Sequence, residues 1–247
     1  MKKKIVDNLK RIRDDIADAC ARARRRPEDV RLIAVTKTVE PDIIRHVLEL
    51  NLADLGEAKV QDLLQRHAII EESIQRRSAL AAADNAPPLP RPRWHMIGHL
   101  QRNKVKQLLP IVTLIHSVDS LRLAEEINTM AAKLGLDQKV KILLEVNTSQ
   151  EKQKFGLAVG AVTAMADQIQ TLPNLQLVGM MTMAPLTEDP QIPRFCFARL
   201  REIFEELRGT RVVGPEFKHL SMGMSQDYIQ AVEEGATLLR IGTALFQ

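Results

Sequence analysis

The chain has 247 residues, of which 45% are hydrophobic, so it can bury a substantial core and suits one large domain or two small ones. Its formal net charge of +4 is mildly basic and falls well short of that of a dedicated nucleic-acid-binding protein. No apolar run approaches the roughly 18 to 20 residues of a membrane-spanning helix, and residues 1–15 lack the apolar segment of a secretory signal peptide.

The first element predicted from the N-terminus is an amphipathic helix over residues 2–25, because apolar residues recur there at helical spacing. The residues of this stripe are Ile5, Leu9, Ile12, Ile16 and Cys20. Basic residues cluster at 2–4 and 22–26, and no aromatic residue or glycine is interleaved with them for stacking on bases. We therefore expect a solvated basic face, with binding of nucleic acid or of an acidic protein as the alternative.

After this helix, strand-like and helix-like segments alternate. Eight short runs read as strands, over residues 31–37, 53–57, 93–98, 114–119, 139–147, 175–184, 217–223 and 237–242. Helical segments separate them, over residues 41–50, 59–74, 102–109, 121–134, 161–172, 195–207 and 226–233. A doubly wound sheet usually needs fewer strands, and no G-x-G-x-x-G follows the first one. The pattern predicts an α/β fold, a single (β/α)8 TIM barrel over residues 1–247.

The segment over residues 75–93 interrupts this alternation. It holds four prolines between Pro87 and Pro92 and shows little apolar periodicity. Proline fixes one backbone dihedral and lacks the N–H donor that regular structure needs. We therefore expect a proline-rich surface loop over the whole segment.

The chain has two cysteines, Cys20 and Cys196, which lie far apart in predicted helices. Neither belongs to a CxxC pair or to any other metal-binding spacing. We expect two reduced, buried thiols in a cytoplasmic protein.

His95 and His99 lie four residues apart, a spacing that can place two metal ligands on one helix face. Here the pair straddles a predicted strand end and Gly98, and no acidic ligand lies between the two histidines. We therefore expect no metal site at this pair.

In a (β/α)8 barrel, functional groups gather at the carboxyl ends of the strands, and phosphate commonly binds the loops after the seventh and eighth strands. The residues there that offer hydroxyl groups or glycine backbone are Ser221, Gly223, Ser225, Gly242 and Thr243. Glycine lets backbone N–H groups approach an anion closely. Tight turns alone would explain one such loop, but the two loops together indicate a phosphate site.

Two cations stand out at strand ends. Arg240 lies in the otherwise apolar eighth strand and shares side-chain parity with Leu238 and Gly242. If that face is the interior, its guanidinium needs a polar partner, either a glutamate or an acceptor atom of a bound heterocycle. Lys37 ends the first strand, and a lysine at a strand end can simply extend into water. Held at an apolar barrel mouth, its amine would instead be desolvated, which favours the neutral form that attacks carbonyl groups. Pyridoxal 5′-phosphate (PLP) has an aldehyde that would react with Lys37, a ring nitrogen that would face Arg240 and a phosphate that would bind the loops after the seventh and eighth strands.

Several segments from about residue 30 to the C-terminus resemble, in order, the motifs of the YggS/PROSC family. This is a family of PLP-binding proteins thought to act in PLP homeostasis. The segments are "LIAVTKT", "LGEAKVQD", "WHMIGHLQRNK", "EVNTSQEKQKFGL", "VGMMTMAP" and "LSMGMSQDYIQAVEEGATLLRIGTALF".

The resemblance implies a single barrel similar to the N-terminal domain of alanine racemase, the PLP fold type III. It also implies that Lys37 forms a Schiff base with PLP and that Arg240 faces the pyridine nitrogen. The residues implied to hold the phosphate are Ser221, Gly242 and Thr243, with the Met222 backbone nearby. The family's Gly-Glu-Asn motif reads Gly-Glu-Ala over residues 56–58, which removes an amide near the cofactor ring.

Arg240 also bears on catalysis, because a guanidinium cannot accept a hydrogen bond and should leave the pyridine nitrogen unprotonated, which weakens the ring as an electron sink. We expect no second domain to supply an opposing tyrosine base, and Tyr228, the single tyrosine, falls in a predicted helix. The favoured function is therefore a monomeric, non-catalytic PLP carrier in PLP homeostasis, with PLP-dependent apo-enzymes or a regulatory protein as partners. The enzymatic alternatives are a small PLP-dependent amino-acid racemase and a Schiff-base aldolase that uses Lys37 without PLP.

Overall fold

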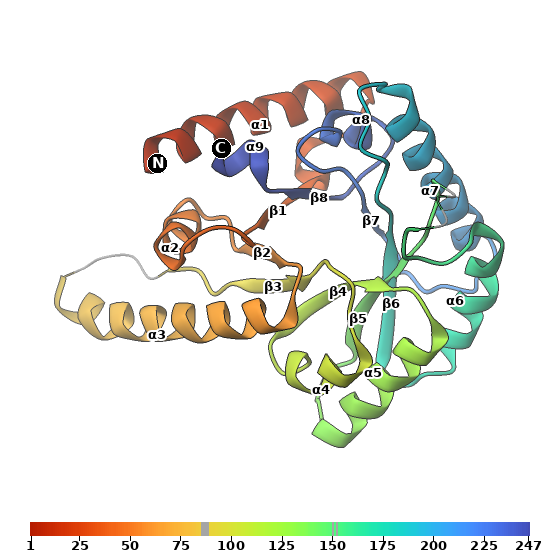
Figure 1. Ribbon diagram of the computed structural model, residues 1–247, viewed down its shortest axis with the longest axis horizontal. Coiled ribbons are helices and arrows are strands. Elements are labelled where there is room, and N and C mark those ends of the chain that lie inside the picture. The colour runs from red at the N-terminus through yellow and green to blue at the C-terminus, as the bar shows by residue number, and fades with distance from the viewer. Residues whose placement is uncertain (85–88, 150, 152) are drawn as a thin grey trace.

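Eight parallel strands close into a barrel in the order in which they occur along the chain, and helices surround it (Figure 1). The structure is a computed structural model that describes residues 1–84, 89–149, 151 and 153–247. The predicted (β/α)8 class is confirmed. The strands are β1 (Arg31–Val35), β2 (Asp54–Glu57), β3 (Arg93–Met96), β4 (Val112–Val118), β5 (Val140–Glu145), β6 (Leu175–Met181), β7 (His219–Ser221) and β8 (Leu238–Ile241).

The first and last strands close the barrel by pairing in parallel, with Arg31 opposite Leu238 and Ala34 opposite Ile241. The α-helices are α1 (Lys2–Arg22), α2 (Pro41–Glu49), α3 (Val60–Asp84), α4 (Val105–Leu108), α5 (Leu121–Leu134), α6 (Val162–Gln170), α7 (Gln191–Gly209), α8 (Tyr228–Glu233) and α9 (Thr243–Phe246). The described residues also form short 3₁₀-helices: η1 (Pro27–Asp29), η2 (Arg102–Lys104) and η3 (Val159–Ala161). Among the helices of the described ranges, none is both long and apolar enough to cross a membrane.

The N-terminal helix α1 closes the outer ring, where it packs against α8 and α9 (Figure 1). Its predicted apolar stripe is buried: Ile5, Leu9, Ile12, Ile16 and Cys20. Cys20 and Cys196 are free, buried thiols, as the sequence predicted. The helix α9, which lies directly after the last strand, has no counterpart among the predicted elements.

Most of the apolar core lies between the strands and the surrounding helices, while the barrel interior holds a small separate apolar cluster. The members of that inner cluster are Ile33, Leu114, Leu143, Val178, Met181 and Leu238. Because side chains alternate along a strand, Arg240 follows Leu238 onto the interior face, and its side chain is buried there. The predicted entry of an arginine into the barrel is therefore confirmed.

The helix α3 corrects the prediction of a loop over residues 75–93. It continues from Val60 to Asp84, so the first part of that segment is helical. Residues 75–84 are rich in Ala and Arg, which have high helix propensity, and the first proline comes only at residue 87. Residues 89–92 have no regular secondary structure, and the remainder of the predicted loop, residues 85–88, lies outside the described residues.

The helix α7 begins at Gln191, four residues before the predicted start. Pro193 lies in its first turn, where a missing backbone N–H costs no helical hydrogen bond. Pro193 is therefore compatible with a helix that begins at Gln191.

Candidate functional site

A cavity of about 750 Å³ opens at the carboxyl ends of the strands. This volume lies within the range of small-molecule sites. Five of the candidate residues from the sequence line it: Lys37, Ser225, Arg240, Gly242 and Thr243. The structure thus brings together the amine, the guanidinium and the loop after β8, which the sequence places far apart.

Lys37 lies in the turn between β1 and α2. The four residues before it, 33–36, are buried, whereas the Lys37 side chain is exposed at the rim of the cavity. The desolvated amine expected from the sequence is therefore not observed. The backbone of the turn is held by Arg66, whose Nη2 donates a hydrogen bond to the carbonyl oxygen of Lys37 at 3.1 Å.

The carboxylate of Glu57 anchors this turn from inside the barrel wall. It is fully buried, and it accepts hydrogen bonds from the Thr36 hydroxyl and, at 2.9 Å, from Arg66 Nη1. Burial raises the pKa of Glu57, and the Arg66 guanidinium acts in the opposite direction. Arg66 therefore links a buried carboxylate to the backbone that carries Lys37. Ala58, at which the sequence departs from the motif that it resembles, lines the cavity.

Ser225 joins the loops that follow β7 and β8. Its hydroxyl oxygen accepts hydrogen bonds from the backbone N–H groups of Gly242, at 3.3 Å, and Ala244, at 3.0 Å. The turn out of β7 requires glycine, because Gly223 has a φ of +93° and a Cβ there would lie 2.5 Å from a side chain of α8. Ser225 lines the cavity, so it is the hydroxyl group that the loop after β7 presents at the mouth.

Arg240 is only 3% exposed and donates two hydrogen bonds inside the barrel. Its Nη1 donates to Ser221 Oγ at 2.6 Å, and its Nη2 donates to the carbonyl oxygen of Thr182 at 2.9 Å. Burial lowers the pKa of Arg240 to about 10, against the opposing effect of the carboxyl groups of Asp227 and Glu145. The guanidinium therefore remains charged at neutral pH. Its hydrogen-bond partners are a serine hydroxyl and a backbone carbonyl, and not the glutamate considered from the sequence.

Ser221 and Met222, which the resemblance implies to lie at the phosphate, are not among the residues that line the cavity. Ser221 is fully buried below the cavity, and its hydroxyl contacts Arg240 and, at 2.8 Å, His116 Nδ1. The backbone N–H of Met222 donates to the carbonyl oxygen of Leu238 at 3.2 Å, within the barrel wall. Ser221 ends β7 on the interior face, below the mouth of the cavity. Its hydroxyl therefore contacts Arg240, while the Ser225 hydroxyl lies at the rim.

Acidic groups form another part of the cavity wall. Glu145 ends β5, and burial, with a further contribution from Asp119, raises its pKa to about 7. Asp119 lies 3.3 Å from His99 Nδ1, and the His99 ring stacks on Phe155 with ring centroids 4.1 Å apart. A carboxyl group that titrates near neutral pH therefore faces the same cavity as Lys37.

The histidine pair and the tyrosine considered from the sequence lie in separate places. His99 is at the mouth, whereas His95 is buried inside the barrel between Asp54 and His116. The hydroxyl of Tyr228 donates to Asp15 of α1 at 2.5 Å, on the outer side of the barrel. Burial raises the pKa of Tyr228, and the neighbouring Asp15 raises it further. Neither His95 nor Tyr228 lines the cavity.

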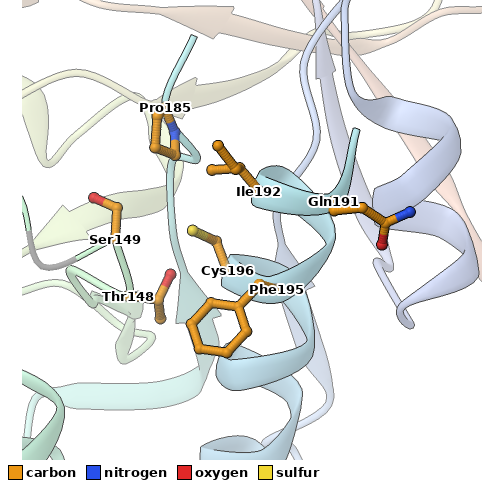
Figure 2. A pocket seen from close by; sticks show the side chains of 7 residues that line it. All are labelled: Thr148, Ser149, Pro185, Gln191, Ile192, Phe195 and Cys196. Carbon is orange, nitrogen blue, oxygen red and sulfur yellow. The ribbon is translucent and has the colours of Figure 1, made fainter. Parts of the chain in front are cut away.

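A second pocket, of about 470 Å³, lies between α7 and the loops after β5 and β6. Figure 2 shows Thr148, Ser149 and Pro185 on one side and Ile192 and Cys196 of α7 on the other. Burial raises the pKa of the Cys196 thiol, which makes it a poor nucleophile. This pocket therefore offers little chemistry beside the cavity that Lys37 lines.

Comparison with known proteins accounts for this arrangement. The family model for the alanine racemase N-terminal domain matches residues 8–247. The pyridoxal phosphate homeostasis protein of Aquifex aeolicus is 39% identical over 240 residues, which cover 97% of this chain and 96% of that protein. The chain belongs to the pyridoxal phosphate homeostasis protein family. The resemblance inferred from the sequence motifs is thus confirmed.

Solved structures extend the comparison from this family to the fold. PipY of Synechococcus elongatus, whose structure has PLP bound, is 32% identical with a TM-score of 0.73, over 94% of this chain and all of that one, 100%. Alanine racemase of Clostridium difficile is 15% identical with a TM-score of 0.69, over 99% of this chain but only 56% of that one. At that identity the racemase shows the shared fold alone.

Proposed function

We propose that this chain binds PLP in the cavity at the barrel mouth and holds it as a Schiff base on Lys37. The observation that carries the proposal is that Lys37, Arg240 and the loops joined by Ser225 line one cavity. PLP has an aldehyde for the amine, a ring nitrogen for the guanidinium and a phosphate for the loops. The neutral amine would attack the aldehyde carbon, a C=N bond would replace C=O, and the oxygen would leave as water.

The backbone around Gly242 fits a phosphate group. A Cβ on Gly242 would lie 3.4 Å from the Cβ of Val35, an ordinary van der Waals contact, so packing within the protein does not demand glycine there. Because Gly242 lines the cavity, a side chain at this position would instead cover the loop backbone. An anion that approaches backbone N–H groups closely would explain the glycine.

The surroundings of the cavity support binding without efficient amino-acid turnover. Bound PLP supplies an electron sink whose strength depends on protonation of its ring nitrogen. Arg240 remains charged and can only donate hydrogen bonds, so it would keep that nitrogen unprotonated. Tyr228, the single tyrosine, is engaged with Asp15 outside the cavity.

One observation favours a racemase as the second candidate. Glu145 lines the cavity and has a pKa of about 7, which suits a group that takes up and returns a proton at neutral pH. Amino-acid turnover that disappears in Glu145→Gln would support this candidate over the carrier.

We further propose that one domain over residues 1–247 holds PLP and passes it to PLP-dependent apo-enzymes. The exposure of Lys37 at the rim supports release of PLP, because the amine of another protein could reach the Schiff-base carbon that would be bonded to the Lys37 nitrogen. The names of the relatives, pyridoxal phosphate homeostasis proteins, agree with this role.

The test combines turnover with transfer. The protein is incubated with PLP and freed of excess cofactor. In the turnover assay it receives a single amino-acid enantiomer, and chiral analysis measures formation of the other enantiomer. In the transfer assay it is mixed with a PLP-dependent apo-enzyme, and the activity that this enzyme recovers is measured. We expect no turnover at ordinary enzymatic rates of about 1 to 10³ per second, recovery of the apo-enzyme, and no recovery with Lys37→Ala. Lys59→Ala, an exposed lysine after β2, is the matched control that should behave as wild type. Turnover at those rates, or transfer by Lys37→Ala equal to wild type, would contradict the proposal.

A further inference from the structure

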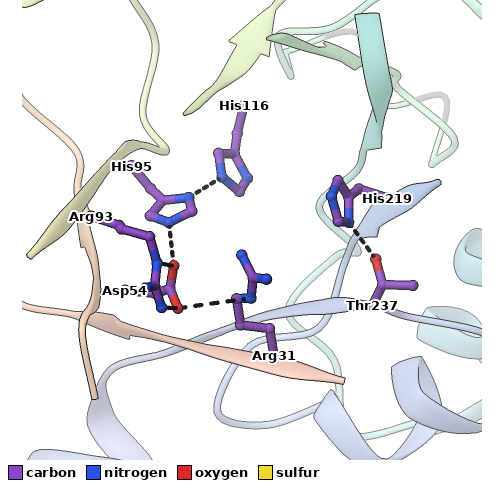
Figure 3. Close-up of polar contacts among 7 residues, drawn as sticks. All are labelled: Arg31, Asp54, Arg93, His95, His116, His219 and Thr237. Atoms are coloured by element: carbon purple, nitrogen blue, oxygen red, sulfur yellow. Dashed lines mark hydrogen bonds and ion pairs between the residues drawn. The ribbon is translucent and has the colours of Figure 1, made fainter. Parts of the chain in front are cut away.

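A chain of hydrogen bonds crosses the barrel interior from the amino ends of the strands to Arg240. His95 Nε2 lies 3.0 Å from Asp54 Oδ1, and His95 Nδ1 lies 3.0 Å from His116 Nε2. His116 Nδ1 lies 2.8 Å from Ser221 Oγ, which accepts the hydrogen bond from Arg240 at 2.6 Å. Figure 3 shows the lower part of this chain, with Asp54, His95 and His116 linked in series. All five side chains are buried.

The lower end of the chain is a fixed anion. Arg93 donates two hydrogen bonds to the carboxylate of Asp54, at 2.8 and 2.6 Å, and Arg31 lies 3.8 Å from it. Although burial opposes ionisation, these hydrogen bonds, together with that of His95, hold the pKa of Asp54 far below its usual range. Asp54 can therefore only accept, so His95 Nε2 must carry the proton of that hydrogen bond.

The surroundings of the two imidazoles favour their neutral forms by lowering the pKa of each. Burial lowers the pKa of His95 despite Asp54, and burial lowers the pKa of His116 further. The charged groups facing them are Asp54, Arg31, Arg93 and Arg240, and His219 lies close by. All of these except Asp54 disfavour an imidazolium.

A neutral imidazole has one donor and one acceptor, so each link determines the next. Since His95 donates from Nε2, its Nδ1 accepts from His116 Nε2. His116 Nδ1 is then an acceptor, so the Ser221 hydroxyl donates to it. The Ser221 oxygen is left with lone pairs directed at Arg240, which is the geometry that a guanidinium donor needs.

We propose that Asp54, His95 and His116 are positioning residues that act on Arg240 through Ser221. They hold the Ser221 hydroxyl in the one orientation that accepts from Arg240 Nη1. With Nη1 fixed there and Nη2 on the Thr182 carbonyl, the guanidinium plane is set, and its remaining N–H groups are oriented for the ring nitrogen of the cofactor. This role rests on the PLP binding proposed above.

The opposite direction of donation is the alternative arrangement. If His95 were protonated on both nitrogens, it would donate to His116, and His116 would donate from Nδ1 to Ser221. The Ser221 oxygen would then accept from both His116 and Arg240, and its own proton would lose its acceptor. The two arrangements differ in which nitrogen of His116 carries hydrogen.

The first test measures this directly in the cofactor-free protein by ¹⁵N NMR of labelled histidine. The six histidines are assigned with single His→Gln variants. We expect both His95 and His116 to be neutral and protonated on Nε2. A proton on Nδ1 of His116, or an imidazolium at His95, would overturn the proposed direction whether or not PLP binds.

The second test measures PLP affinity by absorbance titration. His116→Phe and Ser221→Ala should each weaken PLP binding about tenfold, as expected for a perturbed hydrogen bond to a charged group, and the double variant should be no weaker than either. His219→Phe removes a neighbouring imidazole outside the chain of hydrogen bonds and should stay within about twofold of wild type.

Pyridoxal, which lacks the phosphate, separates the ring contact from the phosphate contact. The same fold-loss with pyridoxal as with PLP is expected, because Arg240 acts at the ring. A loss seen with PLP alone would place Ser221 at the phosphate and overturn the proposal, as would additive effects of the two substitutions. If the wild type binds no PLP, the proposed function fails and the positioning role fails with it, while the NMR result still decides the direction of the hydrogen bonds.

Discussion

Replacing Arg66 with alanine should destabilise the protein through the buried carboxylate that it neutralises. Glu57 is fully buried, and the side chain of Arg66 is 16% exposed. Removing one partner of a buried ion pair costs about 3 to 5 kcal/mol. Because Thr36 still donates to Glu57 in the variant, we take the lower end, about 3 kcal/mol. For a chain of this size that corresponds to a fall in Tm of about 6 to 12 °C.

The effect of Arg66→Ala should also depend on pH in a stated direction. Burial raises the pKa of Glu57 even with Arg66 present, so without the guanidinium the folded protein should hold the proton of Glu57 more tightly still. Since stability falls with rising pH wherever the folded state binds more protons, the loss relative to wild type should be larger at pH 7.5 than at pH 5. Adding Glu57→Gln to the variant should recover part of the loss, because the amide carries no charge.

The assay is thermal unfolding of the cofactor-free protein, followed by circular dichroism at both pH values. Arg76→Ala is the matched control, since Arg76 lies on the same helix and pairs with Glu72 at the exposed surface. That control should change stability by less than about 0.5 kcal/mol. A fall in Tm for Arg66→Ala no larger than that of the control, or of equal size at pH 5 and pH 7.5, would refute the reasoning.

Two further predictions concern the cavity wall. Burial raises the pKa of Glu145 to about 7, so the folded protein holds this proton more tightly than the unfolded chain. The wild type should therefore lose about 3 kcal/mol of stability from this group as pH rises from about 4.5 to above 7. Chemical denaturation should show that Glu145→Gln flattens this decline. An unchanged pH profile would mean that Glu145 is solvated. Ser225→Ala should weaken binding of PLP about tenfold but leave pyridoxal within about twofold. The reason is that the Ser225 oxygen accepts from the N–H groups of Gly242 and Ala244, which leaves its own hydroxyl proton to donate to the phosphate in the cavity. Equal losses for both ligands in absorbance titrations would argue against a phosphate site at these loops.

The barrel and the place of Lys37 could be predicted because each follows from a local pattern. Alternating strand and helix signals specify the fold class, and in this fold a residue that follows a strand lies at the mouth. Parity grouped Arg240 with Leu238, and the structure, which places Leu238 in the inner apolar cluster, decides that this shared face is the interior. The exposure of Lys37 could not be predicted, because it depends on how the turn between β1 and α2 is held by Arg66 of a distant helix.

The role of Ser221 could not be obtained from sequence position alone. Parity places Ser221 on the interior face, but its depth below the mouth depends on where β7 ends and on which strands face it. Its partner His116 comes from β4, and only the closed barrel brings that strand close to β7. His116 shares side-chain parity with Leu114, as Arg240 does with Leu238, so the signal that singled out Arg240 could have marked His116 as well.

The helix α3 was missed past Ile74 because a long stretch without an apolar stripe was interpreted as loop. Its helix-forming composition favoured continuation to Asp84, and the four prolines that argue for a loop begin only at Pro87. Helix propensity was therefore a better guide there than periodicity.

Absorbance with borohydride reduction tests the central claim most directly. Purified protein is mixed with PLP, its spectrum is recorded, the complex is reduced, and the modified peptide is identified by mass spectrometry. We predict a band near about 420 nm for the wild type and for Lys59→Ala but not for Lys37→Ala, and a reduced adduct on Lys37. A wild type that gains no band with PLP, or an adduct confined to another lysine, would contradict the assignment of this cavity as a PLP site.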